Sequence, residues 1–263
     1  MPAKQISGIW IYPVKSLGGI RMPSAKVLSK GLQHDRRWML VDEQLRFMTQ
    51  REYPAMALFR LEYNNSGFSI QYDGDTIQLP FEASSKEIAA TIWNDAVTVQ
   101  EVSPQHSEWF SIKLGTNCKL VAFPENNQRN IDIAYAHNGE QVSLADGYPM
   151  LIIGQASLDD LNNRLDKPVP MDRFRPNLVF NGGEPYEEDS WKDFSIGNCR
   201  MAGIKPCGRC TIPTVDQQTG KKGIEPLATL SVYRRQNNKV LFGQNLVPLS
   251  GGIISEGDII TME

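Results

Sequence analysis

The sequence predicts a β-rich α+β protein with two lobes, and three observations support this expectation. Short runs of β-branched and aromatic residues, separated by glycine, proline and aspartate, recur along the chain. Helical periodicity is confined to a few short segments. Residues 124–130 are polar apart from one proline, so we place a boundary there. The predicted domains are a β-rich N-terminal domain over residues 1–122 and a second domain over residues 123–263.

The strands of the first lobe are predicted from runs of β-branched and aromatic residues that end at turn-forming residues. Asp73-Gly74-Asp75 is typical of a tight hairpin turn between two of these strands. The predicted strands cover residues 7–12, 36–41, 57–63, 68–72, 76–79, 96–102 and 119–123.

Three short helices are predicted from capping residues and apolar spacing. Ser103 is a suitable N-cap, Pro104 fits the first helical position, and Gly115 can end this helix. Ser157 is expected to cap a second helix that carries leucines at helical spacing. A third helix is predicted over residues 225–233. The strands predicted in the second lobe cover residues 177–180, 199–204, 211–215, 252–254 and 258–261.

Composition and charge exclude several classes of protein. The 263 residues are 41% hydrophobic and 22% charged, which is typical of a soluble globular chain. The formal net charge of −3 argues against a general nucleic-acid binder. Apolar runs such as residues 150–153 are far shorter than the roughly 20 residues of a membrane span, and no secretory signal is visible. We therefore expect a cytoplasmic protein that binds neither a nucleic-acid polymer nor a membrane.

The most informative stretch contains Cys207 and Cys210 at CxxC spacing. A thioredoxin-type pair needs its first cysteine at a helix N-terminus, which favours the thiolate, but the sequence predicts a strand over residues 211–215. A structural zinc site needs four ligands, and the other candidates lack paired spacing. These candidates are Cys118, Cys199, His34, His106 and His137.

Two further interpretations of the cysteine pair remain open. Free cysteine is often buried and inert. However, Lys205, Gly208 and Arg209 predict an accessible and electropositive loop, which is the environment that favours a thiolate. One thiolate on such a loop could bind a soft metal in a cofactor, provided that cations elsewhere hold the cofactor's anionic part.

Two motifs in the first lobe offer suitable polar groups. Lys15 and Ser16 follow the first predicted strand, where a cation and a hydroxyl can bind phosphate. Arg36 and Arg37 begin an apolar strand, so one of them should face inward and require an anionic partner. A solvated strand end and a structural salt bridge are the alternatives for these two motifs.

A third motif lies in the second lobe. Pro176 disfavours a helical conformation at Arg175, and in an extended chain Arg175 and Asn177 project to the same face. A guanidinium beside an amide suits phosphate or the edge of a pterin-like ring. A surface arginine and a turn asparagine explain the motif equally well.

Taken together, these stretches resemble the MOSC family. The resemblance is to the branch with an additional N-terminal β-barrel-like domain, which includes the mitochondrial amidoxime-reducing component and bacterial relatives. It extends from about residue 5 to the end of the chain, and the motifs occur in the family's order and spacing. The matching motifs are YPVKS at 12–16, DRRW at 35–38, Thr49 with Arg51 and Pro54, FRPN at 174–177, EDSW at 188–191, CGRC at 207–210, VD at 215–216 with TG at 219–220, and EPL at 225–227.

The resemblance implies a MOSC β-barrel domain, preceded by the smaller β-rich domain, with a few short helices. It also implies a pyranopterin molybdenum cofactor, with Cys210 as the metal ligand and catalytic residue. Gly208 stands where relatives can have serine, so only its backbone could contribute. The residues that match the family's cofactor-binding positions are Lys15, Ser16, Arg36, Arg51, Arg175, Asn177, Gly208 and Arg209.

The activity implied is a two-electron reduction of N-hydroxylated compounds such as amidoximes, hydroxylamines and N-hydroxylated nucleobases, which would serve detoxification. Some bacterial relatives carry a ferredoxin domain whose iron–sulfur cluster needs four cysteines. Because no cysteine follows Cys210, we expect no such cluster in this chain. Pyridoxal phosphate is not expected either. A separate flavin, haem or iron–sulfur protein would then supply the electrons. A non-catalytic cofactor carrier and a sulfur-transfer protein with a persulfide on Cys210 are the alternatives.

Overall fold

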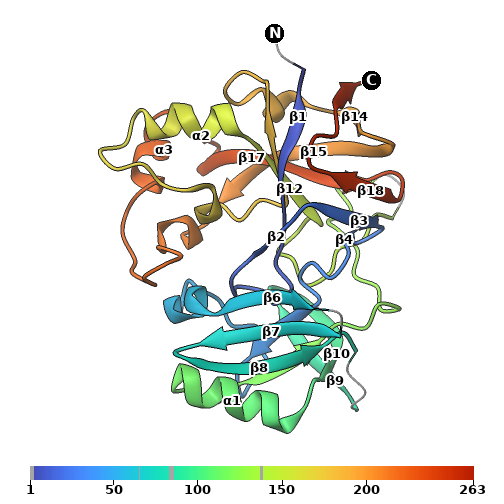
Figure 1. The fold of residues 1–263 in the computed structure, drawn as a ribbon, viewed down its shortest axis with the longest axis vertical. Coiled ribbons are helices and arrows are strands. Elements are labelled where there is room, and N and C mark those ends of the chain that lie inside the picture. The colour runs from blue at the N-terminus through green and yellow to red at the C-terminus, as the bar shows by residue number, and fades with distance from the viewer. Residues whose placement is uncertain (1–2, 65, 83–85, 137–138) are drawn as a thin grey trace.

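The computed structural model describes residues 3–64, 66–82, 86–136 and 139–263. The chain forms two lobes stacked along the long axis of the molecule (Figure 1). Strands dominate both lobes, as the sequence predicts, and the described α-helices are short. Within the described residues, no helix is both long and apolar enough to cross a membrane.

The upper lobe in Figure 1 is built on a large mixed sheet. Its strands pair in the order β19-β14-β15-β17-β12-β13-β1-β2, and β16 adds beside β17. Only β12 and β13 are parallel among these described pairs. The strands are β1 (Gln5–Ile11), β2 (Ile20–Met22), β12 (Met150–Gly154), β13 (Leu178–Asn181), β14 (Asp193–Ile196), β15 (Cys199–Arg209), β16 (Arg235–Gln236), β17 (Lys239–Pro248) and β19 (Ile260–Met262).

Short helices flank this sheet, and a small sheet lies toward the lower lobe (Figure 1). The small sheet pairs β18, β3 and β4. These elements are α2 (Gln155–Asn162), α3 (Leu227–Tyr233), the 3₁₀ turns η2 (Met171–Arg173), η3 (Glu187–Ser190) and η4 (Ile212–Thr214), and the strands β3 (Ser24–Leu28), β4 (Gly31–Leu32) and β18 (Gly252–Ser255).

The lower lobe contains two further sheets, paired in the orders β5-β11-β10-β9 and β6-β7-β8, with α1 on its outer side (Figure 1). Its elements are β5 (Trp38–Val41), η1 (Pro54–Leu58), β6 (Arg60–Asn64), β7 (Gly67–Tyr72), β8 (Asp75–Pro80), β9 (Glu87–Ile92), β10 (Asp95–Glu101), α1 (Pro104–Leu114) and β11 (Lys119–Ala122).

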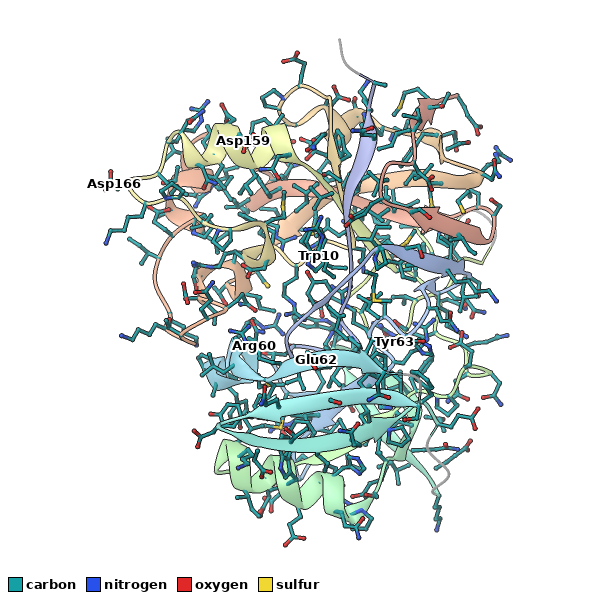
Figure 2. All side chains as sticks on the ribbon, in the orientation of Figure 1. Trp10, Arg60, Glu62, Tyr63, Asp159 and Asp166 are labelled. Carbon is teal, nitrogen blue, oxygen red and sulfur yellow. The ribbon has the colours of Figure 1, made fainter. Side chains whose placement is uncertain are left out.

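The chain passes from the upper lobe to the lower lobe and back, so both lobes contain N-terminal residues. One apolar cluster runs through both, from Ile9 and Phe180 in the large sheet to Phe59 and Phe110 in the lower lobe. Figure 2 shows Trp10 and Arg60 at the junction between the lobes. This shared core fixes the geometry of the junction.

The first helix confirms its sequence prediction in detail. The Ser103 hydroxyl accepts a hydrogen bond from the backbone N–H of His106 at 3.3 Å. Pro104 occupies the first helical position, where a missing N–H costs nothing. Gly115 ends the helix at φ +66°, a left-handed conformation that favours glycine.

Other predicted elements are wrong in position or type. The helix α2 follows Gly154, and Ser157 is not its N-cap, because the Ser157 hydroxyl donates to Glu188 at 2.9 Å. Residues 211–215 do not form a strand, since Pro213 lies in the 3₁₀ turn η4. The strand predicted from residue 36 begins at Trp38. The strand predicted over 57–63 is divided between η1 and β6.

The strand β17 was not predicted, although it pairs with both β12 and β15. Gly243, Gln244 and Asn245 interrupt its apolar pattern. Gly243 adopts φ +80°, and a Cβ there would lie 2.7 Å from Ile153. Because β12 approaches so closely, position 243 requires glycine. The same glycine breaks the apolar pattern from which a strand would be predicted.

Candidate functional site

An open cleft with a cavity volume of about 140 Å³ lies at the junction of the lobes. Every cofactor-binding residue predicted from the sequence lines this cleft except Arg51. The lining comes from four separate parts of the chain: residues 15–36, 145–151, 174–177 and 207–212, with Asn245 added from β17. The predicted residues in the lining are Lys15, Ser16, Arg36, Arg175, Asn177, Gly208, Arg209 and Cys210.

The charge of the cleft is strongly positive. Its lining contains Lys15, Arg36, Arg175 and Arg209. Asp146 is the one acidic side chain among the described residues that line it. The lining therefore suits a ligand with negative charge.

Lys15 lies on one wall of the cleft with its side chain buried. Its ammonium donates to the Leu144 carbonyl at 2.8 Å and forms an ion pair with Asp146. Burial lowers the pKa of Lys15, and the Asp146 carboxylate acts in the opposite direction. Partial burial of Asp146 favours its neutral form, but Lys15 outweighs this and holds the pKa of Asp146 well below its usual range. The Asp146 carboxylate is therefore ionised near neutral pH.

Arg36 and Arg175 both stack against one aromatic ring, that of Tyr12. The guanidinium carbons lie 4.3 and 4.2 Å from the ring centroid. Burial raises the pKa of Tyr12, so this phenol stays neutral. Burial lowers the pKa of Arg175 to about 10, and the group remains protonated at neutral pH. Tyr12 thus holds two like charges close together through cation–π contacts.

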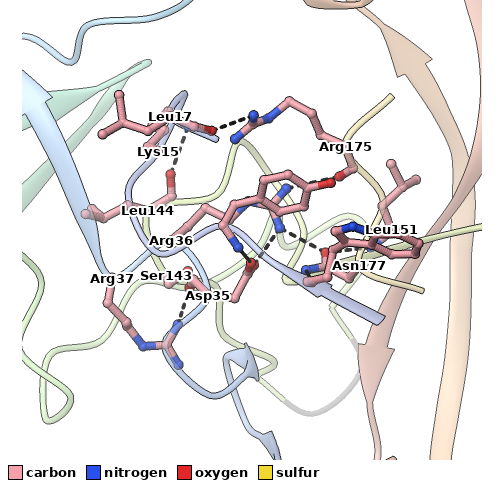
Figure 3. A network of polar contacts seen from close by, with 12 residues as sticks. Lys15, Leu17, Asp35, Arg36, Arg37, Ser143, Leu144, Leu151, Arg175 and Asn177 are labelled. Carbon is pink, nitrogen blue, oxygen red and sulfur yellow. Dashed lines mark hydrogen bonds and ion pairs between the residues drawn. The ribbon is translucent and has the colours of Figure 1, made fainter. Parts of the chain in front are cut away.

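Hydrogen bonds fix both guanidinium groups (Figure 3). Arg36 donates to Asp35 at 2.6 Å and to the carbonyl of Arg175 at 3.2 Å. Arg175 donates to the Leu17 carbonyl at 2.7 Å. Among the described residues, Leu17 is the one hydrogen-bond acceptor of this guanidinium, so further N–H groups of Arg175 are available to a ligand in the cleft that it lines.

The expectation that Arg175 is extended is wrong, because its φ is +55°. Asn177 also differs from the predicted ligand-facing amide. Its Oδ1 accepts from Arg36 at 3.0 Å and from the Leu151 N–H at 3.2 Å, and its Nδ2 donates to the Trp10 carbonyl at 3.1 Å. The amide therefore positions Arg36 and joins β1 to β12, although Asn177 borders the cleft.

The cysteine pair lies where β15 ends. Cys207, Gly208 and Cys210 all line the cleft and are not fully buried. Arg209 donates to the Cys207 sulfur at 3.2 Å and to the Phe174 carbonyl at 2.7 Å. Its Nε is buried and has no hydrogen-bond partner within the described residues. An accessible thiol thus lies beside a guanidinium with unused donor capacity.

A buried arginine holds the loop that follows Cys210. Arg173 donates to the Pro213 carbonyl at 2.7 Å and to the Glu225 carbonyl at 3.0 Å. Its guanidinium also lies 3.7 Å from the Asp216 carboxylate. Arg173 was not singled out by sequence analysis, because only the fold brings residues 173, 213 and 225 together.

The zinc interpretation of the cysteines gains no support from the geometry. Among the described residues, no group of three His, Cys, Asp or Glu side chains converges on a point. Cys199 is buried and its sulfur lies 3.7 Å from the Ile253 carbonyl. Cys118 is also buried, and His137 lies outside the described residues.

Arg51 lies beside the cleft rather than in its lining. Its guanidinium stacks on Trp93 at 4.5 Å from the ring centroid. Trp93 in turn donates from its indole nitrogen to Asp146 at 3.3 Å. Asp146 and Trp93 were missed from the sequence because neither belongs to a motif that indicates a ligand.

Two family models of known proteins match consecutive parts of the chain. Residues 3–117 match the family model of the MOSC N-terminal beta barrel domain, and residues 139–261 match that of the MOSC domain. The chain is 33% identical over 243 residues to mitochondrial amidoxime reducing component 2 of Bos taurus, covering 87% of this chain and 72% of that protein.

Two further relatives are similar over most of the chain. Mitochondrial amidoxime-reducing component 1 of Mus musculus is 30% identical over 275 residues, covering 96% of this chain and 80% of that protein. Molybdenum cofactor sulfurase of Oryza sativa subsp. japonica is 31% identical over 261 residues. That match covers 90% of this chain but 32% of the rice protein.

Proposed function

Because the chain belongs to the MOSC family, with a MOSC N-terminal beta barrel domain before its MOSC domain, we propose that it is a molybdenum cofactor-dependent reductase of N-hydroxylated compounds. The substrates would be amidoximes, hydroxylamines and N-hydroxylated nucleobases. The observation that carries the proposal is the convergence of four cations and the Cys210 thiol on one open cleft. The similarity to two amidoxime-reducing components supports it.

The residues fit an anionic cofactor that contains a soft metal. Thiolate is a preferred ligand of soft metals, and Cys210 is an accessible thiol in the cleft. Guanidinium groups suit phosphate, and Arg209 has a buried Nε without a partner in the described structure. We assign Cys210 as the metal ligand. We assign the four cations, together with Ser16 and the Gly208 backbone, to the anionic part of the cofactor.

When bound, a molybdenum pyranopterin would supply the two-electron redox chemistry. The protein would hold it by Arg175 and Arg209, while Asn177 and Asp35 fix Arg36 in place. We propose that a separate flavin, haem or iron–sulfur protein delivers the electrons. The open side of the cleft would admit the small-molecule substrate.

The test is the molybdenum content of protein purified from a host that makes the cofactor. We expect near-stoichiometric molybdenum in the wild type, a loss of most of it in Cys210→Ala, and retention in Cys207→Ala, the matched control in the same loop. The wild type should also reduce benzamidoxime when a chemical or protein electron donor is present. Zinc in place of molybdenum, or equal loss in both variants, would contradict the assignment of Cys210.

A second candidate function is supported by the match to the rice molybdenum cofactor sulfurase. In this alternative the chain carries the cofactor without reducing a substrate, or it transfers sulfur. For sulfur transfer, the Cys210 thiolate would take the outer sulfur of a donor persulfide, release the donor as its thiol, and pass the sulfur on. Mass spectrometry of the intact protein distinguishes the two. A Cys210-dependent mass increase of one sulfur atom, together with no amidoxime reduction, would favour sulfur transfer.

A further inference from the structure

Asp146 is an unusual residue for a cleft that suits anions. It is the one carboxylate among the described lining residues, and its side chain is 51% exposed. Both described hydrogen-bond donors to it, Lys15 and Trp93, use the same oxygen, Oδ1. No described residue donates a hydrogen bond to Oδ2. One carboxylate oxygen is therefore oriented and free to accept a hydrogen bond from a ligand.

The neighbouring Trp93 adds a second feature of a ligand site. It lies in the turn between β9 and β10 with φ +55°, a strained conformation for a large side chain. In this conformation the indole N–H reaches Asp146 at 3.3 Å. Arg51 covers part of the ring, yet the residue remains 47% exposed. An exposed aromatic surface beside a free acceptor fits a planar ligand with N–H donors.

We propose that Asp146, together with Trp93, selects substrates that carry N–H groups next to the N-hydroxyl group, as in amidoximes and N-hydroxylated aminopyrimidines. This inference rests on the proposed reductase function and names its substrate recognition. Asp146 Oδ2 would accept the amino hydrogen of the substrate, and the Trp93 ring would contact its planar part. Asp146 would act only in binding, because it neither gives nor takes a proton in this arrangement.

The carboxylate stays ionised through its contact with Lys15, so it can only accept. A hydrogen bond to a charged group is stronger than one between neutral groups. Substrates without N–H groups would gain nothing from it. The expected selectivity therefore follows from the charge of the acceptor and not from the size of the cleft.

The chain offers a closely matched control in Asp75. Its carboxylate contacts Trp109 at 3.0 Å and Lys113 at 3.2 Å, and its side chain is 52% exposed. Asp75 thus repeats the lysine and tryptophan contacts of Asp146, but on β8, away from the cleft lining. Asp75→Asn should leave substrate selection unchanged.

The experiment compares benzamidoxime with N,N-dimethylbenzamidoxime, in which methyl groups replace the amino hydrogens. In molybdenum-loaded protein, we expect Asp146→Asn to lower kcat/KM for benzamidoxime by about tenfold to a hundredfold, the effect of one hydrogen bond to a charged group. The value for the dimethyl compound should change by less than about threefold. An equal loss for both compounds, or loss of molybdenum from the variant, would overturn the proposal and assign Asp146 to positioning Lys15.

A binding measurement separates this inference from the reductase function. Calorimetry with benzamide, a neutral analogue that retains the amino N–H groups, should show weaker binding to Asp146→Asn than to the wild type and to Asp75→Asn. If the loaded wild type reduces neither amidoxime, the reductase proposal fails, and the calorimetry still decides whether Asp146 recognises N–H donors. Benzamide binding that is equal in all three proteins would overturn the role of Asp146.

Discussion

Asn177 shows how one buried side chain organises the cleft. Its amide joins the Trp10 carbonyl of β1, the Leu151 N–H of β12 and the Arg36 guanidinium. In Asn177→Ala these buried groups lose their partner, and each unsatisfied group costs free energy. We expect the free energy of unfolding to fall by about 2–4 kcal/mol, as measured by urea denaturation. Asn181→Ala, at the exposed end of the same strand, is the control; a loss in Asn177→Ala no larger than in this control would contradict the account.

At the scale of elements, the buried Glu188 of η3 secures the start of α2. It accepts hydrogen bonds from the Gly154 N–H at 3.1 Å and the Ser157 hydroxyl at 2.9 Å. Burial raises its pKa, so the folded protein holds this proton more tightly than the unfolded chain. The contribution of this group to stability therefore falls as the pH rises from its unfolded pKa, about 4.3, to its higher folded pKa.

Glu188→Gln removes this titration and keeps an acceptor. We expect the unfolding free energy of the variant, relative to the wild type, to rise with pH across that window and then to level off. Urea denaturation at a series of pH values measures it, with Asp159→Asn on the exposed face of α2 as the control. A difference that stays constant with pH would show that Glu188 is not the titrating group.

Elements were predictable from the sequence where local chemistry decides them. The caps of α1 and the strands around residues 68–79 are set by neighbours in the chain. The strand β17 and the turn η4 depend on packing against distant strands, which no local pattern reports. The left-handed conformation of Arg175 is likewise imposed by its setting, against the preference of a residue before proline.

The cleft residues were predictable one by one, but their arrangement was not. The motifs around Lys15 and Arg209 gave residues whose side chains suit an anionic ligand. The pairing of Lys15 with Asp146 joins residues 131 positions apart, and Asp146 has no local signal. The assignment of the lining residues to a cofactor stays a prediction that the molybdenum measurement tests.

At the scale of the whole molecule, the cleft and the large sheet both require the two halves of the chain. Lys15 and Arg36 come from the first half, whereas Arg209 and Cys210 come from the second. The strand β1 pairs with β13 in the large sheet. A single apolar cluster continues from one lobe into the other, so we expect both lobes to unfold together.

This dependence predicts the behaviour of residues 123–263 expressed alone. The fragment lacks β1, so the edge of β13 would be unpaired, and the buried side chains of Ile6, Ile9 and Ile11 would be missing from the core. Removing apolar side chains of this size costs about 2–5 kcal/mol each. The combined loss is comparable to the roughly 5–15 kcal/mol of unfolding free energy of a typical domain.

We therefore expect the fragment to show no cooperative thermal transition in calorimetry, while the full chain shows one. Co-expression with residues 1–122 should restore both the transition and the binding of molybdenum, because it supplies β1 together with Lys15 and Arg36. A sharp transition in the isolated fragment would mean that the boundary at residue 122 separates units that fold independently. In that case the cleft would form by docking of two finished domains, and mutations in the shared core would weaken their association without unfolding either one.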